Sequence, residues 1–396
     1  MQKGGKNMNI VIFTDTFPPE INGVATSTFN LFNVLRKNGH NAYVVCTNPF
    51  SKEMLYEDNI LRIPGIELKK LYSYRFSSFY SSKAMKIIKT MKPDVIHVNT
   101  EASIGIFGRI VAKKLKQPLV YTYHTMIEDY TYYVTKSNGF FDRIAKQIVR
   151  SFSKTMASTT TEFISPSEKT KDAIRKYGYE SYINIVPTGI DFSKYESVNE
   201  TEVEDIKRRY DLNDAFVILS LGRIAKEKSI DAIIDGFAKL KTKTKKKIKL
   251  LIVGGGPDLD NLKEQANRLK LNDDVVFVGP VDASKVPGFY HASNIFVSAS
   301  VTETQGLTFM EAMASRLLVL AKFDENLADV IIDNETGYFF NDVDDMARRV
   351  LAIMKQDEAK QKQIIENAYK ITQKYSLDNF YSNIMEVYKR AIRKYW

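Results

Sequence analysis

The sequence predicts an α/β protein of two domains, each with a doubly wound parallel sheet covered by helices on both faces. Short, fully apolar runs alternate with helical segments along the whole chain. Runs without polar alternation are typical of strands buried on both faces of a parallel sheet. The length of 396 residues suits about two or three domains, each with its own core.

The first half of the chain alternates strands and helices from its first apolar run onward. A strand over Asn9–Phe13 leads through a proline-rich loop to a helix from about Val24 to Asn38, which Gly39 stops. Further strands are predicted at Ala42–Cys46, Asp94–Val98 and Leu119–Tyr123, with later strand or turn units at Phe163–Ser167 and Ile183–Pro187.

The second half repeats this style. Strands are predicted at Ala215–Leu221, Ile248–Val253, Val275–Val278 and Ile295–Ser298, followed by a helix over Leu307–Ser315. We place one domain at 1–196, a second at 197–374, and a final helix at 375–396 that crosses back onto the first domain. The polar and acidic stretch near 192–205 marks the boundary.

Composition narrows the setting of the protein. The one cysteine, Cys46, ends an apolar run and is expected to be a buried strand thiol, which excludes an intrachain disulfide and favours a reducing compartment. The short polar N-terminus is not expected to be a signal peptide. No apolar run reaches the length of about 18 residues that a membrane span needs.

The positive charge is concentrated in one region. Between residues 65 and 160, 16 Lys and Arg stand against 6 Asp and Glu, an excess that equals the net charge of +10 for the whole chain. A solvated face usually mixes signs, so this one-sided field indicates an anionic partner.

Two glutamates eight positions apart are the strongest chemical signal. Glu303 lies in a loop after a strand, and Glu311 lies two turns into the next helix. Carboxylates accept hydrogen bonds from sugar hydroxyls. The helix start at Gln305, Gly306 and Leu307 offers backbone N–H groups that suit a phosphate. The alternative is that Glu303 caps the helix and Glu311 lies on its surface.

Glycine and basic residues follow several predicted strands. Gly222 permits a close approach of the backbone, and Arg223 and Lys228 can bind a phosphate. Gly23 begins a helix after the first strand, another turn that suits a phosphate. Gly254–Pro257, which includes Gly256, forms a tight turn of the same kind. Neither a dinucleotide fingerprint nor a Walker A sequence occurs.

His124 follows a predicted strand directly, where the cleft between two such sheets is expected to open. The other three histidines are interpreted as structural. No two histidines are placed with carboxylates as metal ligands, so we expect no metal and no cofactor.

Taken in order, these segments resemble the retaining glycosyltransferases of family 4, which have the GT-B fold of two Rossmann-like domains facing a central cleft. The resemblance covers nearly the whole chain. It includes the Gly23 loop, the strand end at His124, Pro187–Asp191, Gly222-Arg223 with Lys228, the Gly254–Pro257 turn and the glutamate pair. Within the family the chain is most similar to the bacterial enzymes that glucosylate diacylglycerol, in the runs Ala225–Ile230 and Thr302–Leu307 and in His124-Thr125 followed by Asp129-Tyr130-Thr131.

The resemblance implies a role for each residue. Glu303 binds hydroxyls of the donor sugar, Glu311 holds the ribose, and Arg223 and Lys228 neutralise the diphosphate with help from amides near Gly306 and Gly23. His124 contacts the donor sugar. The resemblance also implies the substrates, UDP-glucose as donor and 1,2-diacylglycerol as acceptor, with α-monoglucosyldiacylglycerol as product. Neither the sugar nor the nucleotide follows from the residues alone.

Two basic helices in the first domain indicate contact with anionic lipids. In residues 140–154, apolar positions alternate with Arg143, Lys146, Arg150 and Lys154; in residues 82–92, Met85, Ile88 and Met91 alternate with Lys83, Lys86 and Lys89. Such helices can lie in the interface of an anionic bilayer. We therefore expect a cytoplasmic protein, peripheral on the inner face of the cell membrane. The alternative is that the apolar flanks pack on the sheet and the lysines are only solvated.

Two other functions remain open at this point. A soluble family-4 glycosyltransferase acting on a sugar or a glycopolymer would share the donor site without needing a membrane. A non-enzymatic protein that binds an anionic polymer would use the basic patch. Nucleic acid is not an expected partner, because no nucleic-acid-binding module is recognisable and the glutamates would repel a polyanion.

Overall fold

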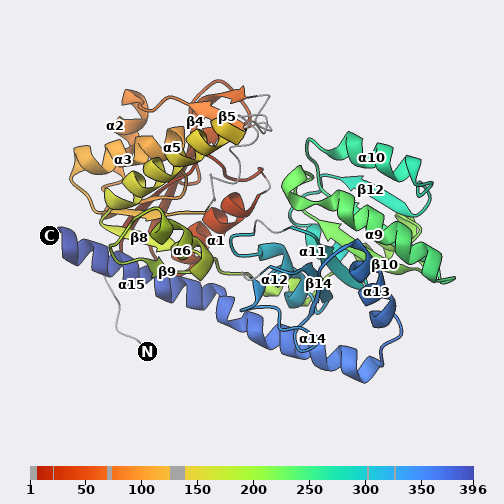
Figure 1. Ribbon diagram of the computed structural model, residues 1–396. Helices are drawn as coiled ribbons and strands as arrows, with labels where there is room; N and C mark the ends of the chain where they lie inside the picture. Colours follow the sequence, from red (N-terminus) through yellow and green to blue (C-terminus); the bar gives the residue numbers. More distant parts are fainter. Residues whose placement is uncertain (1–6, 21, 69–73, 125–138, 301–302, 325–326) are drawn as a thin grey trace. The chain divides into compact units, whose positions relative to one another are not determined.

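The structure is a computed structural model that describes residues 7–20, 22–68, 74–124, 139–300, 303–324 and 327–396. The chain forms two compact units (Figure 1). The N-terminal unit comprises residues up to Gly189 together with Leu377–Trp396, and the C-terminal unit comprises Ile190–Ser376. Both are α/β units with largely parallel sheets, as the sequence predicts.

The N-terminal sheet is built around β1, Asn9–Phe13, whose residues are almost all buried. The strand order is β3-β4-β2-β1-β6-β7-β8-β9. From β2 to β9 the neighbouring strands pair in parallel, namely β2 (Asn41–Asn48), β6 (Val95–Val98), β7 (Leu119–Thr122), β8 (Glu162–Ser165) and β9 (Asn184–Ile185). The carboxyl ends of these strands therefore share one edge of the sheet.

An antiparallel extension, absent from the sequence-based description, follows β2. β4 (Ile60–Leu68) pairs in parallel with β2, while β3 (Leu55–Glu57) and β5 (Tyr74–Ser77) pair with β4 in antiparallel fashion. Ile66 on β4 is 78% exposed, and Phe76, Phe79 and Tyr80 are exposed nearby in the chain. This part of the unit thus shows large apolar side chains to solvent.

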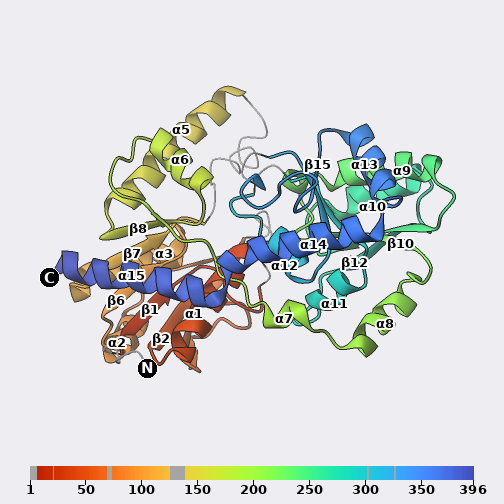
Figure 2. The same cartoon turned by 90° about the horizontal axis from the view of Figure 1, so that it is seen from below.

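Helices cover both faces of the N-terminal sheet. On one face a core cluster includes side chains from α2 (Ser82–Thr90), α3 (Ser103–Leu115), α5 (Gly139–Ser158) and α6 (Glu168–Lys176). On the other face α1 (Gly23–Lys37) packs beside α15 (Leu377–Tyr395), as Figure 2 shows. The final helix therefore belongs to the first domain, as predicted.

A buried carboxylate ties the carboxyl ends of β1 and β6 together. Asp15, 1% exposed, follows β1 and accepts hydrogen bonds from Thr100 Oγ1 at 2.6 Å, Ser103 Oγ at 2.7 Å and the Ile104 amide at 2.8 Å. These donors lie at the start of α3, whose N-cap residue makes no side-chain cap of its own. A negative charge at a helix N-terminus is favourable, so Asp15 caps α3 from a distance in sequence.

The C-terminal sheet is parallel throughout, in the order β12-β11-β10-β13-β14-β15. Its strands are β10 (Phe216–Leu221), β11 (Ile248–Val253), β12 (Val275–Gly279), β13 (Ile295–Ser298), β14 (Leu318–Lys322) and β15 (Tyr338–Phe340). The order reverses between β10 and β13. Ligands bind beside such a reversal in open α/β sheets.

Each face of the C-terminal sheet has its own core cluster. One cluster includes side chains of α9 (Ile230–Lys243), α10 (Leu259–Arg268) and α13 (Val343–Ile353). The other includes side chains of α8 (Glu200–Arg209), α11 (Val286–His291) and α12 (Leu307–Ala314). Residues of α14 (Glu358–Thr372) enter both clusters, and the short α7 (Ser193–Glu196) precedes α8.

The chain passes between the units twice, after Gly189 and after Ser376. The first division lies before the boundary of 196/197 that the sequence suggested, because Ile190 and Phe192 already pack in the C-terminal core. The Ile190 amide also donates to the Tyr375 carbonyl at 2.8 Å.

The structure also bears on the expectations for Cys46 and for membrane-spanning helices. Cys46 is fully buried on β2, and burial raises the pKa of its thiol to about 12, so it is the inert strand thiol that the sequence predicts. Among the helices of the described residues, none combines the length and the apolar character that a bilayer crossing requires.

Candidate functional site

Glycine loops crowd the carboxyl edge of the C-terminal sheet. Gly222 and Gly254 follow β10 and β11, and Gly279 is the last residue of β12; their φ values of +143°, +138° and +86° favour glycine. A Cβ on Gly254 would lie 1.9 Å from the Gly222 carbonyl oxygen, and one on Gly256 would lie 2.0 Å from the Ile224 carbonyl oxygen. The main chains of the two turns are therefore in direct contact at this edge.

Arg223 follows β10 and is held by a residue that the sequence analysis passed over. Glu227, four positions later, forms an ion pair with the Arg223 guanidinium, and its side chain is only 4% exposed. The Arg223 side chain remains about one-third exposed. A guanidinium has five N–H donors in a planar fork, so the buried carboxylate of Glu227 can orient Arg223.

Lys228 and Glu303 are in direct contact. The Lys228 Nζ lies 2.6 Å from Glu303 Oε1, and the two side chains are 28% and 14% exposed. They come from the loops after β10 and β13, strands that are neighbours in the sheet. The structure thus brings together the phosphate candidate and the sugar candidate of the sequence analysis.

Glu311 is held by the hydroxyls of two phenols, and the charge of Lys194 also stabilises its ionised form. Tyr290 on α11 donates its hydroxyl to Glu311 Oε2 at 3.0 Å. Burial raises the pKa of the Glu311 carboxyl above its ordinary value, and hydrogen bonds from Tyr290 and Tyr195 oppose that rise. The Tyr195 and Tyr290 rings lie 6.2 Å apart in a T-shaped arrangement. Glu311 is therefore an oriented, partly buried acceptor, and neither tyrosine could be found from sequence spacing.

Helix α12 begins beside these groups. Gly306 is its N-cap, with φ of +72°, and makes no side-chain cap, while Leu307 is the first helical residue. The preceding Gln305 is 9% exposed, and its amide lies 3.8 Å from the Met310 sulfur. The positive end of a helix dipole favours an anion, so binding of a phosphate at this helix start stays a prediction.

The other two predicted positions lie in the N-terminal unit. Gly23 is the first residue of α1, where Asn22 caps the helix through the Ala25 amide. His124 follows β7, separated from β1 in the sheet by β6. Burial lowers the pKa of His124 to about 4, so its ring is neutral at physiological pH.

The two basic helices differ in what their apolar residues contact. On α2, Met85 and Ile88 are buried in the core, and Met91 just beyond the helix is 4% exposed, whereas Lys83, Lys86 and Lys89 are exposed. The expectation that these apolar residues meet a bilayer is wrong for α2, because the sheet already covers them.

On α5, by contrast, Ile144 and Ile148 are 44% and 64% exposed, next in sequence to the basic set Arg143, Lys146, Arg150 and Lys154. Lys146 also pairs with Asp142 at 2.8 Å. This helix therefore presents both an apolar and a cationic surface.

The metal requirement and the roles of the individual site residues stay predictions. Within the described ranges, no group of three or more His, Cys, Asp or Glu side chains is arranged to hold a metal ion. The expectation that the protein uses no metal stays a prediction, and so does the role assigned to each site residue. Of the segment from His124 to Thr131 that carries part of the resemblance, the structure describes His124, and the other residues lie outside the described ranges.

Two α/β units with largely parallel sheets, and glycine turns at the carboxyl edge of the second, are the architecture of the GT-B fold. Solved structures share this fold. The structure superposes with a TM-score of 0.75 on sucrose-phosphate synthase from Thermosynechococcus elongatus, at 18% identity, covering 96% of this chain and 98% of the other. It superposes with a TM-score of 0.74 on Anabaena HepE in complex with UDP-glucose, at 17% identity, covering 96% and 99%.

Sequence comparison identifies the family. Residues 21–194 match the model "Glycosyltransferase Family 4", and residues 202–371 match "Glycosyl transferases group 1". The α-monoglucosyldiacylglycerol synthase of Streptococcus pneumoniae is 34% identical over 97% of this chain and 86% of its own length. The synthase of Acholeplasma laidlawii is 32% identical over 89% of both chains. The chain belongs to glycosyltransferase family 4.

The contact between glycine turns generates a first prediction. Gly256→Ala should lower the free energy of unfolding by about 1–3 kcal/mol, because its Cβ would overlap a main-chain oxygen that cannot move aside easily. Gly255→Ala is the matched control, since its Cβ would meet Pro280 Cδ at an ordinary 3.5 Å. Urea unfolding of both variants measures the difference. Equal stability of the two would contradict this description of the edge.

Proposed function

We propose that the protein transfers glucose from UDP-glucose to 1,2-diacylglycerol at a membrane surface, with retention of the anomeric configuration, to give α-monoglucosyldiacylglycerol. The observation that carries the proposal is the 34% identity along 97% of the chain to a synthase of that name. The exposed basic and apolar surface of α5 adds a reason for a lipid acceptor over a soluble one.

In the proposed donor complex, the diphosphate lies against Arg223, Lys228 and the first-turn amides of α12. Glu303 accepts hydrogen bonds from glucose hydroxyls, and Glu311 accepts them from the ribose. The contact of Lys228 with Glu303 matters here, because a carboxylate next to a diphosphate would otherwise repel it. An ammonium has three N–H donors, so Lys228 can keep Glu303 and also meet a phosphate oxygen.

The proposed reaction proceeds on one face of the sugar. The bond between the anomeric carbon and the UDP oxygen breaks as the acceptor hydroxyl attacks from the same side, and the leaving phosphate takes the hydroxyl proton. Negative charge grows on that phosphate, so preoriented cations lower the barrier, a contribution of typically several kcal/mol. His124, neutral and at the end of β7, contacts the donor sugar as a hydrogen-bonding group rather than as a cation.

The proposed setting is the inner face of the cell membrane. Helix α5 supplies Arg143, Arg150 and Lys154 to anionic headgroups, and Ile144 and Ile148 can reach the acyl boundary. The lysines of α2 add charge without apolar contact, because that helix is packed on the sheet.

An acceptor comparison tests the proposed function. Purified protein with radiolabelled UDP-glucose should transfer label to 1,2-diacylglycerol in mixed micelles, and the product should be cleaved by an α-glucosidase but not by a β-glucosidase. Soluble sugars and glycopolymers should accept little label. Preferential transfer to a soluble acceptor would support the alternative of a soluble family-4 enzyme.

Removal of either cation should abolish turnover without unfolding the protein. Arg223→Ala and Lys228→Ala are each expected to lower kcat by at least about 100-fold, because the charge on the leaving diphosphate loses its partner. Lys226→Ala is the matched control, since Lys226 is exposed in the same turn. Circular dichroism confirms folding. A folded Arg223→Ala variant with near-normal kcat would refute this role.

Vesicle binding tests the membrane surface. Affinity should rise with the fraction of anionic lipid and fall with salt. Arg143→Ala with Arg150→Ala should weaken binding by about 2 kcal/mol, roughly 30-fold, at about 1 kcal/mol for each basic residue. Lys360→Ala with Lys362→Ala on α14 removes the same charge from exposed positions of the other unit. Sedimentation with vesicles measures both; an equal loss in the two pairs would contradict a specific role for α5.

A further inference from the structure

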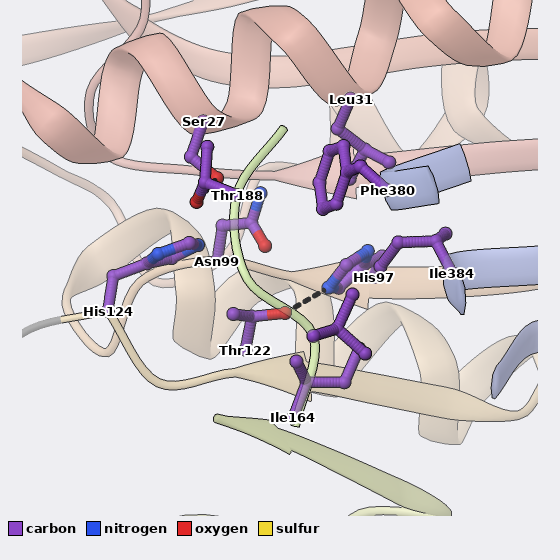
Figure 3. A pocket seen from close by; sticks show the side chains of 11 residues that line it. Ser27, Leu31, His97, Asn99, Thr122, His124, Ile164, Thr188, Phe380 and Ile384 are labelled. Atoms are coloured by element: carbon purple, nitrogen blue, oxygen red, sulfur yellow. Dashed lines mark hydrogen bonds between the residues drawn. The ribbon is translucent and has the colours of Figure 1, made fainter. Parts of the chain in front are cut away.

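A small polar cavity lies beside His124 inside the N-terminal unit. Its volume is about 10 Å³, and its polar lining consists of Ser27, Asn99, Thr122, Thr188 and the rings of His97 and His124. Figure 3 shows the His124 ring turned toward Asn99, the Thr122 hydroxyl directed at His97, and Phe380 of α15 on another wall. A cavity of this size, lined by polar groups, has room for about one water molecule.

Asn99 contributes an unpaired acceptor to this cavity. The residue is 2% exposed, and its Nδ2 donates to Thr28 Oγ1 at 3.0 Å. Its Oδ1 is buried and has no hydrogen-bond partner among the described residues. Buried polar atoms are nearly always hydrogen-bonded to protein or to ordered water, so this oxygen calls for a donor inside the cavity.

A chain of hydrogen bonds reaches the same cavity from the final helix. The Tyr388 hydroxyl lies 2.7 Å from His97 Nδ1, and His97 Nε2 lies 2.8 Å from Thr122 Oγ1. Burial raises the pKa of Tyr388 well above its ordinary value and lowers that of His97 to about 3, so the phenol keeps its proton and the imidazole is neutral. A neutral imidazole donates from one nitrogen and accepts at the other.

We propose that one water molecule in this cavity joins Thr122 and Asn99 to the ring of His124 and sets its tautomer. The Tyr388 hydroxyl donates a hydrogen bond to His97 Nδ1, and the Nε2–H of His97 donates one to Thr122 Oγ1. The Thr122 hydroxyl in turn donates a hydrogen bond to the water. The two protons of the water then bond Asn99 Oδ1 and one ring nitrogen of His124. The other ring nitrogen of His124 therefore carries the proton and can donate.

This arrangement makes Asn99, Thr122 and His97 positioning residues. The arrangement explains how a neutral His124 can donate an N–H to a hydroxyl of the donor sugar, and this part of the inference rests on the proposed function. The tautomer itself is a property of the free protein, and it can be measured whether or not the proposed reaction occurs.

The test is nitrogen-15 NMR of the full chain labelled at histidine, which has four histidines to assign. His124→Gln identifies the His124 signals, whose shifts report the tautomer. Thr122→Val, which removes the hydroxyl at nearly constant volume, should mix the two tautomers, and Tyr388→Phe should do the same more weakly. Tyr381→Phe is the matched control, because its hydroxyl lies 2.9 Å from His40 Nε2 and is outside the chain to His124.

Unchanged His124 shifts in Thr122→Val, or equal changes in Tyr381→Phe, would overturn the proposal. A crystal structure of the unaltered protein gives an independent answer. Water density within hydrogen-bond distance of Asn99 Oδ1 would support the proposal, and a cavity without such density would contradict it. With UDP-glucose and diacylglycerol, Thr122→Val should lower kcat by about tenfold or less with little change in the donor KM. If the tautomer shifts but the unaltered protein transfers no glucose, the proposed function fails and this inference stands.

Discussion

The contact between Lys228 and Glu303 is the interaction on which the proposed donor site depends. It joins residues 75 positions apart at 2.6 Å. It exists because β10 and β13 are neighbours at the point where the strand order reverses, so that the loops after them meet. A carboxylate that binds sugar hydroxyls must lie close to a diphosphate, and a cation between them offsets the repulsion. The strand order thus allows a carboxylate for the sugar hydroxyls and a site for the diphosphate to lie close together.

Much of this arrangement follows from the sequence, and the missing part has a physical cause. Fully apolar runs predicted the parallel strands, and Ile248–Val253 and Ile295–Ser298 have the predicted bounds. The residue types that follow the predicted strands of the second half pointed to the carboxyl edge of that sheet, where Arg223, Lys228 and Glu303 lie. Spacing does not reveal partners that come from other elements, such as Tyr290. Nor does it say whether an amphipathic helix meets a sheet or a membrane; the same pattern on α2 and α5 has different outcomes.

The side chains proposed to bind the donor are oriented before any ligand arrives. Arg223 is held by the nearly buried Glu227, and Glu311 by the hydroxyl of Tyr290. Ordering a long side chain costs conformational entropy, so a partner that orders it in the free protein lowers the cost of binding. These supporting residues carry no signal of their own in the sequence, yet they decide how rigid the site is.

The final helix has the corresponding importance for the N-terminal unit. Phe380, Ile384 and Tyr388 of α15 complete the core on one face of that sheet, although they lie almost 200 residues after its last strand in sequence. Arg390 extends this anchoring through the buried Glu162 of β8, at 3.0 Å. Because the same helix reaches His97 and the cavity beside His124, the end of the chain both closes a core and fixes the surroundings of a predicted site residue. A truncation in α15 therefore cannot be interpreted as a loss of stability alone.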